Sequence, residues 1–349
     1  MAHDLDLYYT TCMTLVEQAS EVIVKAFSKA KKVETKSSDI DLVTETDKEV
    51  EDLLINGLRK AFPSHKFIGE ESVSGGEKCV LGDDPTWIID PVDGTMNFVH
   101  TFPLIAISIG LLIEKKPVIG VICNPVLGQS YTARLGQGAF LNGKPIKVSG
   151  QTELSKALLC TEFGTSTDIE KREVVLKNLT TFLARCHGVR GIGTCCCAMT
   201  MVACGAADAF CHLGMHCWDM AAGQLIIEEA GGFLCDYGVE LVGEEYRIYI
   251  IQYNLKLNLA NIFSSRALGS AAMNIASVAS GGVDAYYEFG LHAWDMAAGE
   301  LIIKEAGGCV IDTTGGPFDL MSRRIVCAGS EKLAKEIAGL LEQFELERD

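Results

Sequence analysis

The stretch WIIDPVDGTMNF, residues 87–98, runs from an apolar β-strand into an acidic turn. Asp90 ends the strand and Asp93 follows three residues later, so the two carboxylates can share hard cations, which prefer oxygen ligands. Free backbone N–H groups at Gly94 and Thr95 suit a phosphate. Taken alone, an Asp-x-x-Asp turn after a strand is more often structural than functional. The functional interpretation therefore depends on further acidic residues elsewhere in the chain.

Helical and β-rich segments alternate in blocks around this stretch. Apolar residues at helical spacing predict a long amphipathic helix over residues 4–30. A second helix is predicted over residues 47–62, and its start has a capping-box pattern formed by Thr46 and Glu49. Short β-rich runs separated by Gly, Pro, Asn and Lys then occupy residues 65–149. The first half of the chain is therefore predicted to place helices beside a sheet.

The second half returns to alternating helices and strands and closes with the amphipathic helix KLAKEIAGLLEQFEL, residues 332–346. The full order of helix, sheet, helix, sheet and helix is compatible with stacked α/β layers. We divide the chain into an N-terminal α+β part over residues 1–150 and a C-terminal α/β part over residues 151–349.

Composition limits the partners that the chain can have. With 349 residues, 48% of them apolar, it is long enough for two domains or one large α/β body. A net charge of −16 argues against nucleic acid or an anionic membrane as the main partner, and no apolar run approaches the roughly 18 residues of a membrane span. The absence of a signal peptide and the 14 scattered cysteines, expected to be reduced, predict a cytoplasmic protein. An anionic small substrate fits this charge if metal ions reverse its local sign.

Other carboxylates also lie at predicted element ends, where a cleft would form. Glu70 and Glu71 end the strand KFIGEE, Asp47 lies at the start of the second helix, and Asp295 opens the apolar helix MAAGELIIKEAGG. Two of them have a structural alternative: Glu71 could be a solvated strand end, and Asp295 could be an N-cap worth about 1 kcal/mol. Together they favour a carboxylate cluster.

One segment of the chain is written twice. HCWDMAAGQLIIEEAGG begins at His216 and HAWDMAAGELIIKEAGG begins at His292. Residues 190–236 align with residues 266–312 at a constant offset of 76, with 23 identities in 47 positions. The intervening residues 237–265 resemble nothing else in the chain. Two copies are too few for a solenoid, so a repeat architecture is excluded.

Four motifs, GEES, WIIDPVDGTMNFVH, WDMAAGELIIKEAGG and TGGPFDLMSRR, together resemble those of the inositol monophosphatase family. The resemblance covers nearly all of the chain outside the 76 additional residues. It implies a layered α-β-α-β-α sandwich, usually a homodimer, that hydrolyses small phosphate monoesters with Mg²⁺ and is inhibited by Li⁺. The expected reaction converts myo-inositol monophosphates to myo-inositol and phosphate.

By motif position, the resemblance implies metal ligands that each offer a carboxylate or carbonyl oxygen. These are Glu70, Asp90, the carbonyl of Val92, Asp93 and the aspartate of the Trp-Asp pair, which is Asp219 in the first copy and Asp295 in the second. Bound metal ions would neutralise the phosphate and lower the pKa of a bound water, so no covalent intermediate is required.

The resemblance also implies catalytic and substrate-binding residues. Thr95 and Asp47 would position the attacking water, and Glu70 would orient the resulting hydroxide. The amides of Gly94 and Thr95 would hold the phosphate, and Glu288 would meet a ring hydroxyl.

A single metal cluster can use only one Trp-Asp helix. The first copy directly follows the preceding segment, whereas the second has Glu288 and leads into GGPFDLMSRR, so we favour Asp295 as the ligand. We interpret the two copies as alternative versions of one segment. The residues that join them could be translated intron. Removing 76 residues leaves a 273-residue chain that contains each expected element once. In the full chain, one copy must lie outside the core and expose apolar helix faces.

Two alternatives remain to the expected function. One is a phosphatase of another small ester, such as a nucleotide or sugar phosphate. The other is a non-catalytic regulatory protein whose extra copy disables the site.

Three consecutive cysteines, Cys195–Cys197, stand near Cys211-His212 and His216-Cys217 and raise the question of a zinc site. The spacing lacks paired C-x-x-C, and the second copy has other residues at these places. We interpret these cysteines as small buried residues.

Overall fold

The structure, a computed structural model, describes residues 3–29, 31, 33–35, 42–163, 168–234, 266–344 and 346–348. The described residues form two compact units. The first holds residues up to Arg266 except His100–Phe102, and the second holds His100–Phe102 and the residues from Ala267 onward. The predicted boundary at residue 150 thus falls inside the first unit. Residues 237–265, on which the intron hypothesis depends, lie outside the described residues.

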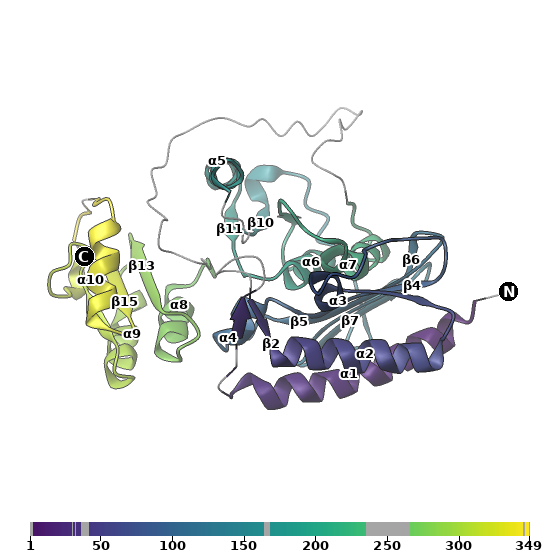
Figure 1. The fold of residues 1–349 in the computed structure, drawn as a ribbon. Helices are drawn as coiled ribbons and strands as arrows, with labels where there is room; N and C mark the ends of the chain where they lie inside the picture. Colours follow the sequence, from purple (N-terminus) through teal and green to yellow (C-terminus); the bar gives the residue numbers. More distant parts are fainter. Residues whose placement is uncertain are drawn as a thin grey trace. The chain divides into compact units, whose positions relative to one another are not determined.

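A seven-stranded sheet forms the centre of the first unit (Figure 1). Its order follows the sequence, with only the first pair of strands parallel and the other pairs antiparallel. The strands are β3 (Lys66–Gly69), β4 (Thr86–Asp93), β5 (Ala106–Ile113), β6 (Lys116–Asn124), β7 (Gln129–Arg134), β8 (Ala139–Leu141) and β9 (Lys144–Ile146). The β-rich runs read from the sequence are therefore confirmed as one sheet.

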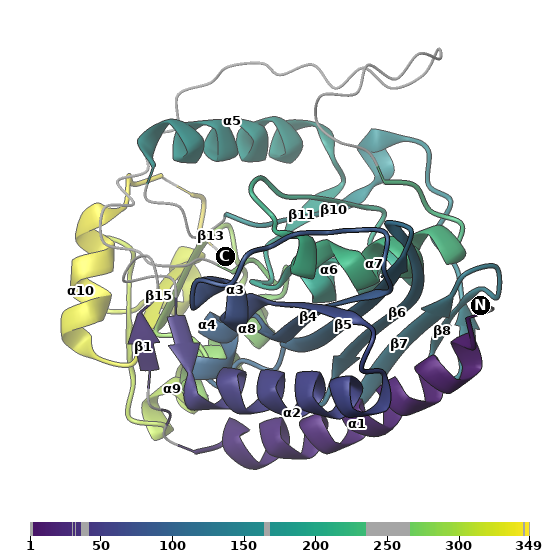
Figure 2. The same ribbon diagram turned by 45° about the vertical axis from the view of Figure 1, so that its right-hand side comes forward.

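Two long helices, α1 (Leu5–Phe27) and α2 (Glu45–Ala61), cover one face of this sheet. Figure 2 shows them side by side below the strands. The predicted capping box at Thr46 and Glu49 is wrong, because α2 starts earlier and Thr44 is its N-cap. Asp47 completes the box by accepting a hydrogen bond from the Thr44 backbone N–H at 3.0 Å. A short ladder of β1 (Val33–Thr35) and β2 (Leu42–Thr44) precedes this helix.

The opposite face of the sheet is covered by α6 (Cys195–Ala203) and α7 (Cys217–Glu229), both from the first copy of the duplicated segment. The helix α7 approaches very closely because β6 has glycine where it crosses. A Cβ placed on Gly120 would lie 2.6 Å from the carbonyl oxygen of Ala222. This close approach sets the distance between the second turn of α7 and the sheet.

A second, parallel sheet and an outer helix complete the first unit. The strand order is β11 (Gly188–Arg190), β10 (Leu158–Thr161) and β12 (Ala209–Cys211), and α5 (Ile169–Arg185) lies beyond them. The 3₁₀ turn η1 (Leu154–Lys156) precedes β10. The layers therefore run helix, sheet, helix, sheet, helix, and the predicted α/β sandwich class is confirmed.

The second unit contains the second copy and the C-terminal segment. The helices α8 (Ala271–Ala279), α9 (Ala293–Glu305) and α10 (Glu331–Leu340) surround an antiparallel sheet of order β13 (Ala285–Phe289), β15 (Arg324–Ala328), β14 (Cys309–Ile311), with the 3₁₀ turn η2 (Leu320–Ser322) before β15. The closing helix ends at Leu340, six residues before the predicted end. Two small apolar clusters form the interior of this unit.

The two copies have very different environments. Trp218 is 8% exposed and Leu225 is 0% exposed, whereas their counterparts Trp294 and Leu301 are 75% and 62% exposed. The expectation that one copy lies outside the core with exposed apolar helix residues is confirmed, and that copy is the second. In the described part of the chain, no helix combines the length and the hydropathy that a membrane span requires.

Candidate active site

Two aspartates lie where β4 loses its regular pairing with β5. Asp90 pairs with Ser108 and Asp93 with Ala106, so the ladder shifts between the two aspartates. The Asp90 carboxylate accepts a hydrogen bond from the Val92 N–H at 3.1 Å. Both carboxylates are buried. The shift places two acidic side chains three residues apart at one end of the central sheet, as the sequence predicted.

Asp93 is held by the start of α6. Its Oδ2 accepts hydrogen bonds from the Thr194 hydroxyl and from the Cys196 N–H, the latter at 2.8 Å. Thr194 is the N-cap of this helix, and its hydroxyl also accepts from the Cys197 N–H at 3.2 Å. The N-terminus of a helix favours a carboxylate because its N–H groups lack intrahelical partners. The first copy thus orients Asp93 directly.

Glu70 reaches the same place from α3 (Glu70–Ser74), which begins where β3 ends. The structure corrects the prediction that Glu70 and Glu71 end the strand, because both residues lie in this short helix. Buried Glu51 on α2 accepts hydrogen bonds from the Glu71 and Ser72 N–H groups at 2.7 and 2.8 Å. These bonds fix the first turn of α3. Glu70 in turn shares a hydrogen bond with the Asp90 carboxyl group.

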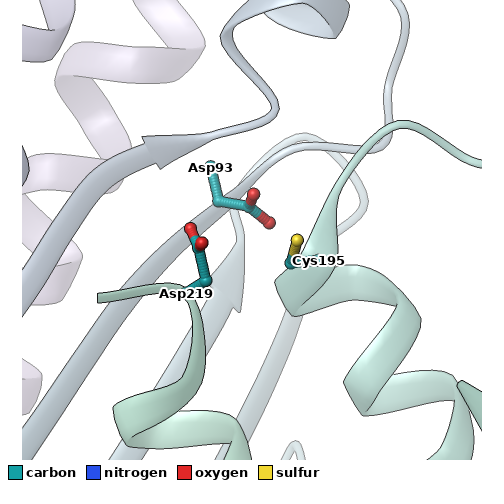
Figure 3. A group of neighbouring side chains, drawn as sticks. All are labelled: Asp93, Cys195 and Asp219. Atoms are coloured by element: carbon teal, nitrogen blue, oxygen red, sulfur yellow. The ribbon is translucent and has the colours of Figure 1, made fainter. Parts of the chain in front are cut away.

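Asp219 completes the cluster from the first turn of α7. Its carboxylate accepts a hydrogen bond from the His216 N–H at 2.6 Å. Ligand atoms of Asp93, Asp219 and Cys195 all lie within 4.8 Å of one another. Figure 3 shows the two carboxylates and the thiol directed toward one another.

The geometry thus favours Asp219 over the preferred Asp295. Asp295 belongs to the second unit, where it accepts a hydrogen bond from the His292 N–H at 2.9 Å at the start of α9. The N-cap of α9 is His292 and not Asp295, so the N-cap alternative is wrong; Asp295 is the third residue of the helix and completes its capping box, as Asp219 does in α7. The helix α7 of the first copy packs closely on Gly110 and Gly120 of the central sheet, and the first copy is also the nearer of the two in sequence to that sheet.

The carboxylates repel one another electrostatically. Burial, followed by the charges of Glu70, Asp93 and Asp219, raises the pKa of Asp90 well above its usual value. Burial raises the pKa of Asp93 as well, and burial followed by the Asp93 charge raises that of Asp219 to about 7. Several buried carboxylates with raised pKa values, all offering oxygen atoms, are the donor set that divalent cations such as Mg²⁺ prefer. The residues present therefore fit a bound divalent cation.

Thr95 and Asp47 meet beside this cluster. The Thr95 hydroxyl lies 3.2 Å from Asp47 Oδ1 and 3.1 Å from the Val92 carbonyl oxygen, so it can donate to either. Thr95 begins α4 (Thr95–Val99), and Gly94 before it has a φ of 87°, a conformation that favours glycine. The structure thus brings together the pair predicted to position water.

Glu288 belongs to a different unit from the carboxylate cluster. It is on β13 in the second unit, hydrogen-bonded to the Tyr286 hydroxyl. The corresponding residue of the first copy is His212, directly after β12, and its Nδ1 lies 2.9 Å from Cys195 Sγ.

Two residues of the site, Glu51 and Thr194, were not predicted, and two others, Cys195 and His212, were considered as zinc ligands and set aside. The pattern GTCCC, typical of an N-cap before an apolar helix, could have indicated Thr194. Nothing comparable marks Glu51, whose hydrogen bonds depend on tertiary packing.

The fold is an α/β sandwich in which acidic residues from β4, α3 and α7 converge on a candidate divalent-cation site. Sequence comparison adds the family. The model of the inositol monophosphatase family matches residues 4–261 and 239–346, so its two matches together contain both copies of the duplicated segment. This chain belongs to the inositol monophosphatase family.

Similar proteins include human inositol monophosphatase 1, which is 40% identical over 338 residues that cover 97% of this chain and 95% of the relative. Mouse inositol monophosphatase 2 is 40% identical over 345 residues, covering 99% and 93%. Among solved structures, SuhB of Mycobacterium tuberculosis is 30% identical with a TM-score of 0.53, over 64% of this chain and 83% of the other.

Proposed function

We propose that this protein is a Mg²⁺-dependent phosphatase that hydrolyses myo-inositol monophosphates to myo-inositol and phosphate. One observation carries the proposal: four carboxylates from three separate elements converge, namely those of Glu70, Asp90, Asp93 and Asp219. Their negative charges repel one another unless a cation binds between them. The curated relatives, which match nearly the whole chain, are named inositol monophosphatases. An anionic substrate would be repelled by this cluster unless cations occupied it.

The carboxylates of the cluster, with the Val92 carbonyl, would hold Mg²⁺. When bound, Mg²⁺ neutralises phosphate charge, lowers the pKa of a bound water and stabilises the leaving alkoxide. Thr194 and the Cys196 N–H keep Asp93 in place, and the His216 N–H does the same for Asp219.

Thr95 and Asp47 would orient the attacking water. The Thr95 hydroxyl proton points to Asp47 or to the Val92 carbonyl, so the remaining lone pairs of Thr95 Oγ1 can accept a hydrogen from water. Asp47 is buried and anchored by the Thr44 N–H, so the pair changes little in position during the reaction. The amides of Gly94 and Thr95 would hold the phosphate group.

The first copy of the duplicated segment lacks the residue that was expected to favour inositol as substrate. Glu288 was expected to meet a ring hydroxyl, but the copy that packs on the central sheet has His212 at the corresponding position. A neutral imidazole binds a hydroxyl with one donor and one acceptor, whereas a carboxylate is an acceptor only. We therefore expect a weaker preference for inositol than the relatives' names imply, with other small phosphate esters as competing substrates.

Phosphate release from myo-inositol 1-phosphate tests the proposal, measured on the full chain with and without Mg²⁺. Asp93→Asn and Glu70→Gln should each remove most of the Mg²⁺-dependent turnover while leaving the circular dichroism spectrum unchanged. Asp295→Asn is the matched control and should keep the turnover of the unmodified chain. A folded full chain that releases no phosphate from any of a panel of small esters would support the regulatory alternative instead.

The 273-residue version, in which Val189 is joined to Arg266, provides the second comparison. It contains Glu288 and Asp295 in place of His212 and Asp219, so it should prefer inositol 1-phosphate more strongly than the full chain does. Lithium inhibition and a homodimer follow from the same family resemblance, and a cytoplasmic location follows from the composition; all three stay predictions.

A further inference from the structure

The first copy places a sulfur and a nitrogen donor beside the carboxylate cluster. Cys195 is the first residue of α6 and is buried, and His212 directly follows β12. Their side chains meet with Cys195 Sγ 2.9 Å from His212 Nδ1. Cys195 Sγ is also one of the three ligand atoms that lie within 4.8 Å of one another, the others belonging to Asp93 and Asp219.

These separations suit a tetrahedral ion. Zinc binds thiolate sulfur at about 2.3 Å and nitrogen or oxygen at about 2.0–2.2 Å, so its ligand atoms lie roughly 3–4 Å apart. Three of the four ligand atoms already lie within 4.8 Å of one another, and His212 Nδ1 lies 2.9 Å from one of these three, Cys195 Sγ. Each aspartate also has its Oδ2 held by a backbone N–H, and these two bonds do not use the other carboxylate oxygen.

A nucleophilic cysteine is the main alternative for a thiol beside an imidazole. That role needs a thiolate stabilised by positive charge. Here the Cys195 thiol lies beside two carboxylates, Asp93 and Asp219, whose negative charge opposes a thiolate. A neutral imidazole is the form that binds a metal, and a divalent cation supplies the positive charge that a thiolate needs.

The second copy provides a comparison within the same chain. Its residues at the positions of Cys195 and His212 are Ala271 and Glu288. It therefore keeps the aspartate, Asp295, but has neither soft donor. The softer ligand set belongs specifically to the copy that packs against Asp93.

We propose that Asp93, Cys195, His212 and Asp219 form a site for Zn²⁺ in this protein. Two carboxylates, a thiolate and an imidazole favour zinc over magnesium, which prefers oxygen ligands and keeps its waters. The site shares Asp93 and Asp219 with the Mg²⁺ site of the proposed function, but zinc binding itself does not depend on phosphatase activity. This assignment replaces our interpretation of Cys195 as only a small buried residue; Cys196 and Cys197 keep that interpretation, because both are buried.

Cobalt substitution tests this site directly on the full chain, stripped of metal and kept reduced. Co²⁺ should produce a thiolate-to-cobalt charge-transfer absorption with one equivalent bound, and Zn²⁺ should displace it. Cys195→Ala, which introduces the residue of the second copy, should remove the absorption and weaken Zn²⁺ binding by roughly tenfold or more.

Cys196→Ala is the matched control, because it makes the same chemical change one residue further along the same helix and also introduces the second copy's residue. It should keep both the absorption and the Zn²⁺ affinity. His212→Glu, again the second copy's residue, should lower Zn²⁺ affinity even if Cys195→Ala does not fold. A charge-transfer band that persists in Cys195→Ala, or an unmodified chain without the band at saturating Co²⁺, would overturn the zinc assignment. Neither readout uses phosphate release, so failure of the proposed function would leave this test valid.

Discussion

Asp219→Asn should change stability and metal binding in opposite directions. In the metal-free protein, burial and the Asp93 charge raise the pKa of Asp219 from 3.8 to about 7. A shift of that size corresponds to about 4 kcal/mol of unfavourable free energy for the ionised carboxylate above pH 7. Asparagine is uncharged and keeps an oxygen that can accept the His216 N–H. We therefore expect the variant to be ~2–4 kcal/mol more stable than the unmodified chain near pH 8 in a chelator.

The sign of the pH dependence follows from the direction of this shift. Because the folded-state pKa is raised, protonated Asp219 contributes stability that is fully present below pH 3.8 and is lost as the pH rises through about 7. The gain from Asp219→Asn should therefore be absent near pH 4, grow between about pH 4 and 7, and stay constant above that. Urea unfolding in a chelator at several pH values measures it.

Metal binding should respond in the opposite way. The same variant should lose most of the stabilisation that the unmodified chain gains from added Mg²⁺, because binding to the folded state stabilises by mass action and the variant lacks a ligand. Asp295→Asn makes the identical change at a hydrogen-bonded position of the same kind and should alter neither quantity. The reasoning is refuted if Asp219→Asn lowers stability near pH 8 without metal, or if Asp295→Asn is the variant that loses the Mg²⁺ response.

Three further changes test the packing and charge around the site. Gly120→Ala brings a methyl group to 2.6 Å from the Ala222 carbonyl oxygen and should cost about 1–3 kcal/mol of unfolding free energy, seen as a lower Tm. Leu225→Ala should cost about 2–5 kcal/mol in urea unfolding because the side chain is fully buried, whereas the equivalent Leu301→Ala should stay within about 0.5 kcal/mol; equal costs would contradict the assignment of the first copy to the core. Burial raises the pKa of Glu162 to about 7, so the stability that its protonated form contributes is lost as the pH rises from 4.5 through 7. Glu162→Gln should therefore make the unfolding free energy depend less on pH in this range. An unchanged pH profile would show that Glu162 is ionised throughout the range.

Local pattern predicted most of the first unit correctly. The strands β4 to β8 could be identified because each is a short β-rich run bounded by turn residues, and Asn142-Gly143 makes its turn with positive φ at both residues. The capping box was misplaced by two residues because Thr44-x-x-Asp47 and Thr46-x-x-Glu49 overlap and both fit the pattern. The neighbouring β2 decides between them by ending at Thr44.

The choice between the copies could not be made from local sequence. Both contain Trp-Asp-Met-Ala-Ala-Gly, and both use their aspartate to cap a helix with the same geometry. What separates them is tertiary packing: the first copy meets Gly110 and Gly120 of the sheet. Completeness of the motif favoured Asp295, but the first copy begins directly at the end of β11, in the same unit as the central sheet.

The strands β12 and β13 are equivalent positions of the two copies, and each lies at the edge of its own three-stranded sheet. Merging them into one strand gives the order β11, β10, β12 or β13, β15, β14, a single continuous five-stranded sheet. We infer that the duplication divides one sheet into two at the repeated strand, so that each sheet keeps the neighbours of one side only. In a chain with a single copy, the repeated strand should pair with β10 on one side and with β15 on the other. The C-terminal strands would then belong to the same sheet as β10 and β11.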